Sequence, residues 1–292
     1  MLNQLQQMLE RRVSEFVSEL EECKDEKAMR KIQCCIERDA EIVKTRGFGR
    51  ICKQSKEADG QKVLYEVHFQ NLIKQGGKLY IEEEVETREA YFKNGTLSRD
   101  SEVFPVQPAV AVSTDLLLDS ISGGDRSSYT YDRRKAVQYA ERWWNSYNPA
   151  FKKFEVDCTN FISQCLHAGG APMRGYPNRG QGWWMRSNNW SFSWSVANSL
   201  RLYLGTSKSG LRAREVSSPD KLLLGDVICY DFEGDGRYNH NTIVVAKDAN
   251  GMPLVNAHTY NSRMRYWAYT DSSAYTPKIK YKFYTIVDDS RE

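Results

Sequence analysis

The chain has 292 residues, of which 27% are charged and 40% are hydrophobic, a balance typical of folded globular proteins. Its formal net charge is only +3, and acidic and basic residues are interleaved, so we expect no nucleic-acid partner. A chain of this length can form one large domain or two modest domains, each with its own core.

The N-terminal segment predicts no secretion signal, because charged residues interrupt each apolar run before residue 23. No stretch approaches the roughly 20 apolar residues of a transmembrane helix, so we expect no membrane span. The seven cysteines form no CxxC pair and the four histidines lie far apart, so we expect reduced thiols, no metal site and no cofactor. The localisation stays unknown from these features, which favour the cytoplasm or a spore over the cell wall.

The first half of the chain predicts a helix followed by an antiparallel meander. Apolar residues recur at helical spacing from Leu2 to Leu20 and onward to Val43, which predicts a long or broken helix to about residue 45. The segments "KVLYEVHF" and "KLYIEEEVETREAYF" then alternate like strands, with Gly-Gly between them and Asn-Gly after them as turn signals. We expect residues 1–120 to form a smaller α+β module, compatible with a cystatin-like or NTF-like cone that serves binding or homodimerisation.

A change of composition predicts a domain boundary near residue 125. Pro, Gly and Ser occur without periodicity over about residues 105–128, and all seven tryptophans follow residue 142. Residues 129–292 predict helices first, in "YDRRKAVQYAERWWNSYN" and in the segment that begins at Cys158, and antiparallel strands afterwards. This order is typical of an α+β domain.

The stretch "EVDCTNFISQCLHAGG" places Cys158 in the first turn of a predicted helix, with Asp157 as its N-cap. Two interpretations fit this segment. Cys158 begins an apolar stripe that continues through Phe161 and Cys165, so it can be an ordinary core thiol. Alternatively, the first-turn N–H groups and the helix dipole lower the pKa of a thiol and prepare it as a nucleophile.

A cysteine nucleophile needs a base, almost always a histidine, and often a third polar group. Of the four histidines, His68 alternates with apolar residues in the first half, and His167 lies more than two turns along the same predicted helix. His240 and His258 remain, at the two ends of a predicted hairpin. If they pair across it, both point to one face together with Asn256, whereas a one-residue slip would separate them.

Four segments in order resemble a known family. "DCTNFISQCLHAGGAPM", "GDVICYD", "NHNTIVV" and "VNAHTYN" are similar to the motifs of the bacterial putative amidase domain family, which resembles the NlpC-type and CHAP cysteine amidohydrolases. The resemblance covers about residues 129–290 and implies a papain-like fold. It further implies Cys158 as the nucleophile, His240 as the base and His258 as the third residue, with Asn256 as the alternative.

The resemblance implies a cysteine-dependent amidase or peptidase that hydrolyses an amide bond through a thioester acyl-enzyme. Its expected substrate is a peptide or a peptidoglycan-like amide, and the Cys158 backbone N–H is the expected oxyanion donor. Two other functions stay open: a catalytically inactive binding protein on the same fold, and an acyltransferase. Retention of Cys158, His240 and His258 argues against the first, whereas nothing in the sequence separates transferase from hydrolase.

The segment between the predicted nucleophile and base is rich in tryptophan. We expect most of these rings to pack over the sheet, because tryptophan buries a large apolar area, and one or two to face a groove. The four rings are Trp183, Trp184, Trp190 and Trp194.

Overall fold

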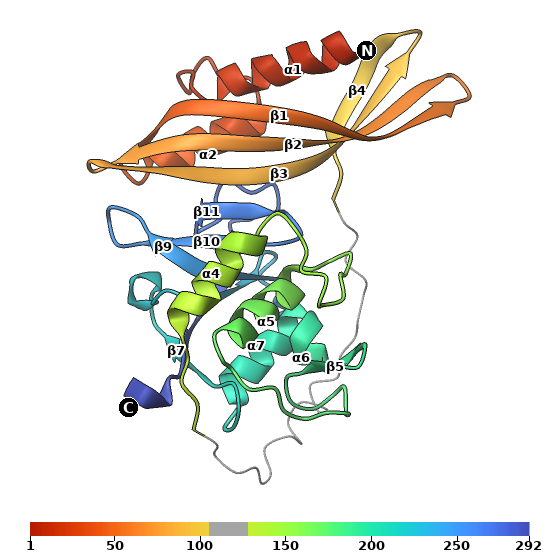
Figure 1. Ribbon diagram of the computed structural model, residues 1–292. Helices are drawn as coiled ribbons and strands as arrows, with labels where there is room; N and C mark the ends of the chain where they lie inside the picture. The colour runs from red at the N-terminus through yellow and green to blue at the C-terminus, as the bar shows by residue number, and fades with distance from the viewer. Residues whose placement is uncertain (105–127, 292) are drawn as a thin grey trace. The chain divides into compact units, whose positions relative to one another are not determined.

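The computed structural model describes residues 1–104 and 128–291, which form two compact units (Figure 1). The first unit comprises residues 1–104 with Asp248–Asn250 and Tyr260–Ser273, and the second comprises the remaining described residues. The predicted boundary near residue 125, which separates 1–120 from 129–292, falls outside the described residues and stays a prediction.

Two helices open the first unit, α1 (Leu2–Glu15) and α2 (Glu26–Ile36). The second begins at a regular N-cap, because the Asp25 carboxylate accepts a hydrogen bond from the Ala28 N–H at 2.9 Å. The predicted continuation of helix to about residue 45 is wrong, since Asp39 has a φ of +55° and strand β1 (Ala40–Glu57) follows directly. The β-branched residues Ile42 and Val43 fit that strand better than a helix.

The predicted antiparallel meander of the first unit is confirmed. Strand β2 (Gly60–Gln75) pairs with β1 and with β3 (Lys78–Lys93), and β4 (Thr96–Glu102) returns along β3. The turn residues have positive φ as their sequence predicts, for example +80° at Gly77 and +51° at Asn94. A short strand from the C-terminal half, β11 (Ser262–Tyr266), also pairs with β3.

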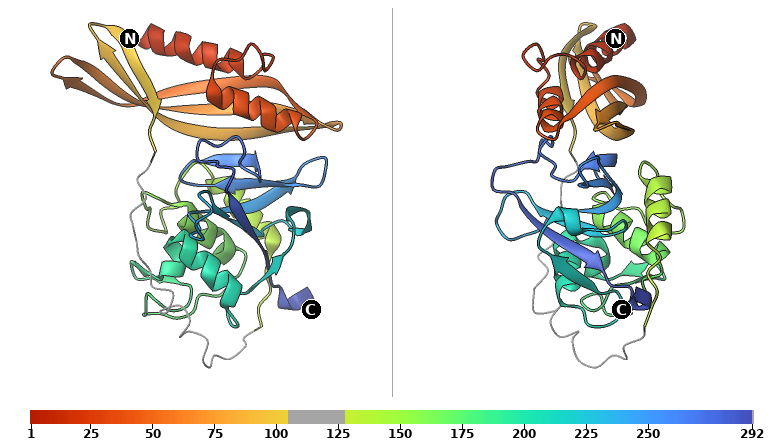
Figure 2. Two further views of the ribbon diagram at one scale, coloured as in Figure 1. Left: turned by 180° about the vertical axis from the view of Figure 1, so that it is seen from behind. Right: turned by 90° about the vertical axis from the view of Figure 1, so that its left-hand side faces the viewer.

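Helices α1 and α2 cover one face of this sheet (Figure 2). Phe16 and Ala28 pack in one buried cluster with Val67 and Phe69 of β2, and the rings of Phe16 and Phe69 lie 5.2 Å apart between centroids. The alternating apolar residues of β2 therefore supply the core of the first unit, as strand periodicity requires.

The second unit begins with the two predicted helices, α4 (Arg133–Trp143) and α5 (Cys158–Ala168). Two further helices, α6 (Phe192–Ser195) and α7 (Ala197–Thr206), lie within and just after the tryptophan-rich segment. In α7 the residues Ala197, Leu200 and Leu204 are buried. Their i, i+3 and i+7 spacing is the helical signal that the sequence carried here.

The sheet of the second unit is antiparallel throughout. Its order is β10 (Pro253–Ala257), β9 (His240–Lys247), β8 (Val227–Asp231), β12 (Lys280–Ile286) and β7 (Ala213–Val216). Helices α4, α5 and α7 contact β9, and they lie together on one side of the strands (Figure 1). The expected α+β class, with helices followed by an antiparallel sheet, is confirmed for this unit.

The minor elements of the second unit are the ribbon β5 (Met185–Arg186) with β6 (Asn189–Trp190) and two 3-10 turns, η2 (Pro219–Lys221) and η3 (Asp289–Arg291). Among the helices within 1–104 and 128–291, none is both long enough and apolar enough to cross a membrane.

Candidate active site

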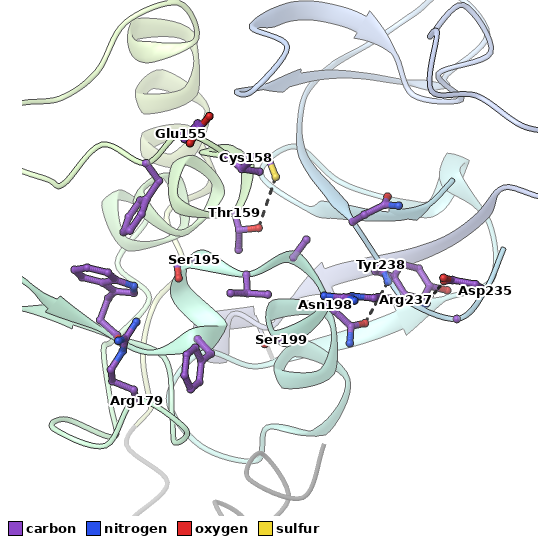
Figure 3. Close-up of a pocket in the computed structure, with 18 residues that line it drawn as sticks. Glu155, Cys158, Thr159, Arg179, Ser195, Asn198, Ser199, Asp235, Arg237 and Tyr238 are labelled. Atoms are coloured by element: carbon purple, nitrogen blue, oxygen red, sulfur yellow. Dashed lines mark hydrogen bonds between the residues drawn. The ribbon is translucent and has the colours of Figure 1, made fainter. Parts of the chain in front are cut away.

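Cys158 is the first residue of α5 and lines a cavity of about 710 Å³ in the second unit (Figure 3). The cysteine residue is only 2% exposed, and its Sγ lies 3.7 Å from Thr159 Oγ1. The cavity walls come from residues 154–156, from the α6–α7 segment 195–199, from the loop 235–239, and from Arg179, Trp190 and Phe192. Segments far apart in sequence therefore line the same cavity as the Cys158 thiol.

The apolar stripe expected along α5 is present. Phe161, Ile162, Cys165 and Leu166 are all buried, and they anchor the helix in the core. Cys165 therefore takes the ordinary role of a small core residue, whereas Cys158, one end of the same stripe, reaches the cavity wall. The two interpretations of the stripe are compatible, because the stripe fixes the helix that presents Cys158.

Asp157 precedes α5 but does not cap it through its side chain. Its buried carboxylate instead accepts hydrogen bonds from the Phe154 N–H and from Asn160 Nδ2, both at 2.9 Å. It also lies 2.8 Å from His258 Nδ1. The expected N-cap role is therefore corrected: Asp157 ties the segment before α5 to the end of β10.

Thr259 provides the hydrogen-bond acceptor for the backbone N–H groups at the start of α5. Its Oγ1 accepts hydrogen bonds from the backbone N–H groups of Asp157 and Cys158, at 3.0 and 3.1 Å. Its φ of +79° is unusual for a β-branched residue and is a strained conformation of the kind found at functional sites. The Cys158 N–H, expected as an oxyanion donor, is thus already bonded to a hydroxyl.

His258 is held on three sides. Its Nδ1 faces the Asp157 carboxylate, its Nε2 lies 2.7 Å from the Trp143 carbonyl oxygen, and its ring stacks on Phe161 with centroids 4.0 Å apart. Both ring nitrogens face oxygen acceptors. The imidazole therefore links Asp157, at the start of α5, to Trp143, at the end of α4.

The pairing of the β9–β10 hairpin differs by one residue from the pairing that would align His240 with His258. Asn256 pairs with Ile243, after a β-bulge between Leu254 and Val255. The extra residue of the bulge shifts the register by one. Because side chains alternate between the two faces of a strand, this shift moves those beyond the bulge to the other face relative to the partner strand. Of the two alternatives for this hairpin, the structure therefore shows the one-residue slip, which separates His240 from His258 and Asn256.

The side chains of β9 show which of its residues face the helices and which face away from them. Asn241 Oδ1 accepts a hydrogen bond from Thr159 Oγ1 of α5 at 2.9 Å, so Asn241 faces the helices. Strand alternation then directs its neighbour His240 toward the opposite face. There the His240 ring lies 5.6 Å from the ring of Tyr230, its partner in the β8–β9 pairing, and 6.1 Å from Phe232.

Asn256, the alternative third residue, points to the helical face. Its Nδ2 donates to Glu141 Oε1 of α4 at 2.8 Å. Of the described residues that line the cavity, Cys158 is one predicted site residue, and His240, His258 and Asn256 are not among them. Asn239, immediately before His240, does line it.

Burial raises the pKa of the Cys158 thiol, and this effect outweighs the opposing hydrogen bonds from Thr159, the Asn241 backbone and Thr259. The expected lowering of this pKa by the helix N-terminus is therefore corrected. The resting thiol is protonated at neutral pH, so nucleophilic chemistry at Cys158 requires a base that accepts its proton during attack.

The loop after β8 is shaped by a buried carboxylate that the sequence did not single out. Asp231 is fully buried and accepts hydrogen bonds from the N–H groups of Gly234 and Gly236, both at 2.8 Å, and from that of Asp235 at 3.2 Å. Asn198 Oδ1 of α7 then accepts from the Tyr238 N–H at 3.2 Å. The part of the cavity wall formed by residues 235–239 is thus fixed by hydrogen bonds.

The tryptophans follow the expected division. Trp183, Trp184 and Trp194 are at most 1% exposed, whereas Trp190 lines the cavity. In the described parts of the chain, no group of three or more His, Cys, Asp or Glu side chains has an arrangement that could hold a metal ion.

The sequence is similar to a known protein family and to proteins of Bacillus subtilis (strain 168). The family model described as "Putative amidase domain" matches residues 130–284. The chain is 52% identical over 267 residues to uncharacterized protein YhbB of Bacillus subtilis (strain 168), which covers 89% of this chain and 86% of that protein. It is 29% identical over 140 residues to uncharacterized protein YjcM of the same organism, covering 45% and 31% of the two chains. No solved structure matches the chain significantly.

Proposed function

Because the chain belongs to the putative amidase domain family, we propose that its second unit is a thiol amidohydrolase in which Cys158 is the nucleophile. The observation that carries this proposal is the position of Cys158. It is the first residue of α5 and it lines the large cavity, whereas Cys165 on the same helix is enclosed in the core.

In the proposed reaction the Cys158 sulfur attacks the carbonyl carbon of an amide, and the thiol proton passes to His240. Because His240 packs beside Tyr230 on the face of β9 opposite α5 in the resting protein, its ring has to turn toward the thiol before it accepts this proton. The C–N bond then breaks as His240 returns this proton to the departing amine. Water next cleaves the thioester, releasing a carboxylic acid and the free thiol. Because burial raises the pKa of Cys158, we expect proton transfer to accompany the attack rather than to precede it.

The roles of the two histidines are supported by different observations. The role of His240 as the base is supported by the motif "NHNTIVV" and by its position in the sequence next to Asn239, which lies in the cavity wall. The role of His258 as the third residue is supported by the bond to Asp157, which acts on the segment that presents Cys158. Asn256 is the reserve for this role, and its bond to Glu141 gives it only a structural contact.

The oxyanion donor in this proposal is the Cys158 backbone N–H. In the resting protein it donates to Thr259 Oγ1, so the substrate oxygen has to replace that hydroxyl as the acceptor. A papain-like topology is part of the same proposal. It is supported by the chain order, in which the helix with the nucleophile comes first, then β9 with His240, and then β10, directly before His258.

As substrate we propose the amide of a peptide, including the stem peptides of peptidoglycan. The cavity is of the size that takes a short peptide segment, and its walls mix aromatic rings with polar groups. Digestion of purified peptidoglycan, with mass spectrometry of the new ends, tests this substrate. Homodimerisation through the first unit and an intracellular location stay predictions.

The test of the nucleophile is labelling with iodoacetamide, read by peptide mapping. Cys52 is exposed and is expected to react whether or not the protein has an active site. The experiment therefore uses a Cys52→Ser background, which removes this thiol. We expect Cys158 to be labelled faster than the buried Cys165 and Cys229, and His240→Ala to remove this advantage. Equal labelling of the three buried thiols would contradict the proposal.

A hydrolase, an acyltransferase and an inactive relative give different products in a second assay. With a peptide amide as donor and an added amine as acceptor, a hydrolase releases mainly the free acid, whereas a transferase releases the new amide. Labelling of Cys158 without either product would identify the binding-protein alternative.

A further inference from the structure

We propose that Arg179 forms a subsite that binds a carboxylate of the substrate, so that the enzyme prefers acidic peptides. This inference rests on the proposed function, because it assigns specificity to the cavity that Cys158 lines. Arg179 belongs to the cavity wall, although it follows α5 by 11 residues and no sequence motif includes it.

The Arg179 guanidinium is held in one orientation. Its Nε donates to the Trp190 carbonyl oxygen at 3.0 Å, and its Cζ lies 5.0 Å from the ring centroids of both Trp190 and Phe192. The Arg179 carbonyl oxygen in turn accepts a hydrogen bond from the Phe192 N–H at 2.8 Å. An exposed arginine usually loses side-chain entropy on binding, whereas this one is already ordered by two aromatic rings.

The terminal nitrogens of Arg179 remain available for a ligand. Among the described residues, only the Trp190 carbonyl receives a hydrogen bond from this guanidinium, and it uses Nε. The two outer N–H groups form the planar fork that matches a carboxylate. A second cation adds to the positive potential, since Lys152 Nζ lies 4.6 Å from the Trp190 ring centroid.

The acidic residues of the cavity lie elsewhere on its walls. In Figure 3, Glu155 is drawn beside Cys158, and Asp235 lies on the far side of the view from Arg179. The Asp235 carboxylate accepts the Arg237 N–H at 2.7 Å within its own loop. An acidic substrate group is therefore repelled from the Glu155 side and attracted to Arg179, which gives the bound peptide a direction.

Aromatic contacts complete the subsite. Phe154 meets Trp190 edge to face, with centroids 4.9 Å apart, so the carbon atoms next to the substrate carboxylate find an apolar wall beside Arg179. This pairing of a fixed guanidinium with apolar rings suits an acidic amino acid, whose side chain has a methylene stem and an anionic end.

Three chloroacetyl peptide probes of equal length test the inference in the Cys52→Ser background. One carries Glu and a C-terminal amide, the second carries Gln and a C-terminal amide, and the third carries Gln and a free C-terminus. The measured quantity is the second-order rate constant for labelling Cys158 at low salt. We expect a preference on the order of tenfold for one of the two probes that carry a carboxylate, and the preferred probe identifies a side-chain or a terminal carboxylate.

The matched variants are Arg179→Gln and Arg186→Gln. Arg186 is also exposed and lies over an aromatic ring, that of Tyr176 at 5.4 Å, but it is not among the described residues of the cavity wall. We expect Arg179→Gln to abolish the preference, so that the charged and neutral probes label Cys158 at equal rates. We expect Arg186→Gln to retain the preference.

Equal rates for all three probes at Cys158, or a preference that survives Arg179→Gln, would overturn the subsite while leaving Cys158 as nucleophile. If no probe labels Cys158 faster than Cys165, the proposed function fails and the inference fails with it. Calorimetric titration of the Cys158→Ser protein with the acidic and neutral peptides, without the chloroacetyl group, provides a readout that needs no reaction at the thiol. There Arg179→Gln is expected to weaken only the acidic peptide.

Discussion

At the scale of single residues, the site depends on the contacts around the start of α5. Asp157 and His258 form a buried pair, and Thr259 occupies the backbone donors of residues 157 and 158. The thiol itself is protonated at rest, because burial raises its pKa. In the proposed mechanism, the Thr259 hydroxyl therefore occupies the Cys158 N–H that the substrate oxygen would use.

Substitution of Thr259 tests this arrangement. Thr259→Val removes the acceptor for two backbone N–H groups, so we expect it to lower the free energy of unfolding by about 1–3 kcal/mol. Thr259→Ser keeps the hydroxyl, so its free energy of unfolding is expected to be close to that of the wild type. Denaturant unfolding monitored by tryptophan fluorescence measures both; equal stability of the two variants would show that the hydroxyl does not satisfy the helix start.

The pH dependence of thiol labelling tests the state of Cys158. A thiol whose pKa is raised in the folded protein is neutral at pH 7, and its thiolate forms only above the ordinary thiol range near about 8.5. We expect the labelling rate in His240→Ala to rise with pH beyond that range. A plateau reached below about pH 8 would indicate a preformed thiolate and contradict the raised pKa.

At the scale of elements, the loop between β8 and β9 forms one wall of the cavity. Gly234 and Gly236 both have positive φ, +71° and +92°, and both donate to Asp231. They differ in their surroundings. A Cβ at Gly234 would lie 2.3 Å from the Lys278 carbonyl oxygen, whereas a Cβ at Gly236 would meet nothing within 4 Å.

The two alanine variants of this loop therefore form a matched pair. Gly236→Ala carries only the cost of a left-handed backbone, on the order of 1–2 kcal/mol. Gly234→Ala carries that cost and a collision with backbone, so we expect it to be less stable than Gly236→Ala by at least about 1 kcal/mol. Thermal unfolding of both variants checks the order; a reversed order would mean that Lys278 does not pack against this loop.

The elements also show what the sequence could predict. The stripe from Phe161 to Leu166 identified α5, and the Gly-Gly and Asn-Gly turns identified the meander, because each is a local pattern. The bulge between Leu254 and Val255 has no such signal, and it shifts the pairing by one residue. The positions of His240 and His258 on opposite faces follow from that shift, so single-sequence reasoning could not reach them.

At the scale of the whole molecule, each unit draws on segments distant in sequence. The first unit includes residues 260–273, whose Asp271 contacts Lys31 and Arg265 in a buried group of charges that also holds Glu82. Burial raises the pKa of Asp271, but the charges of Arg265 and Lys31 outweigh it and hold the pKa well below the usual range. Such a long-range ion group has no local pattern in the sequence.

The charge group predicts how the first unit responds to acid and to substitution. A carboxyl with a lowered folded pKa stabilises the fold above its unfolded pKa, near about 3.9, and that stabilisation is lost as the pH falls through the folded value. We therefore expect the free energy of unfolding to decrease as the pH falls below about 4. Lys31→Met removes the buried cation that Glu82 and Asp271 share, although Arg265 still pairs with Asp271, and it is expected to cost about 3–5 kcal/mol.

The matched control is Lys74→Met, which breaks an exposed pair with Glu41 at 2.9 Å. We expect it to change stability by less than about 1 kcal/mol. Urea titrations at neutral pH compare the two variants. A Lys31→Met protein as stable as Lys74→Met would show that the buried ion group contributes little to this unit.

The proposed function requires Cys158 to form a thioester with the substrate. A nitrophenyl ester of a short acidic peptide, mixed with the protein and quenched in acid within seconds, tests it by intact mass and peptide mapping. We expect one added acyl group, located on Cys158, which is absent in Cys158→Ser and present in Cys165→Ser. An acyl group on another residue, or an equal amount in Cys158→Ser, would contradict it.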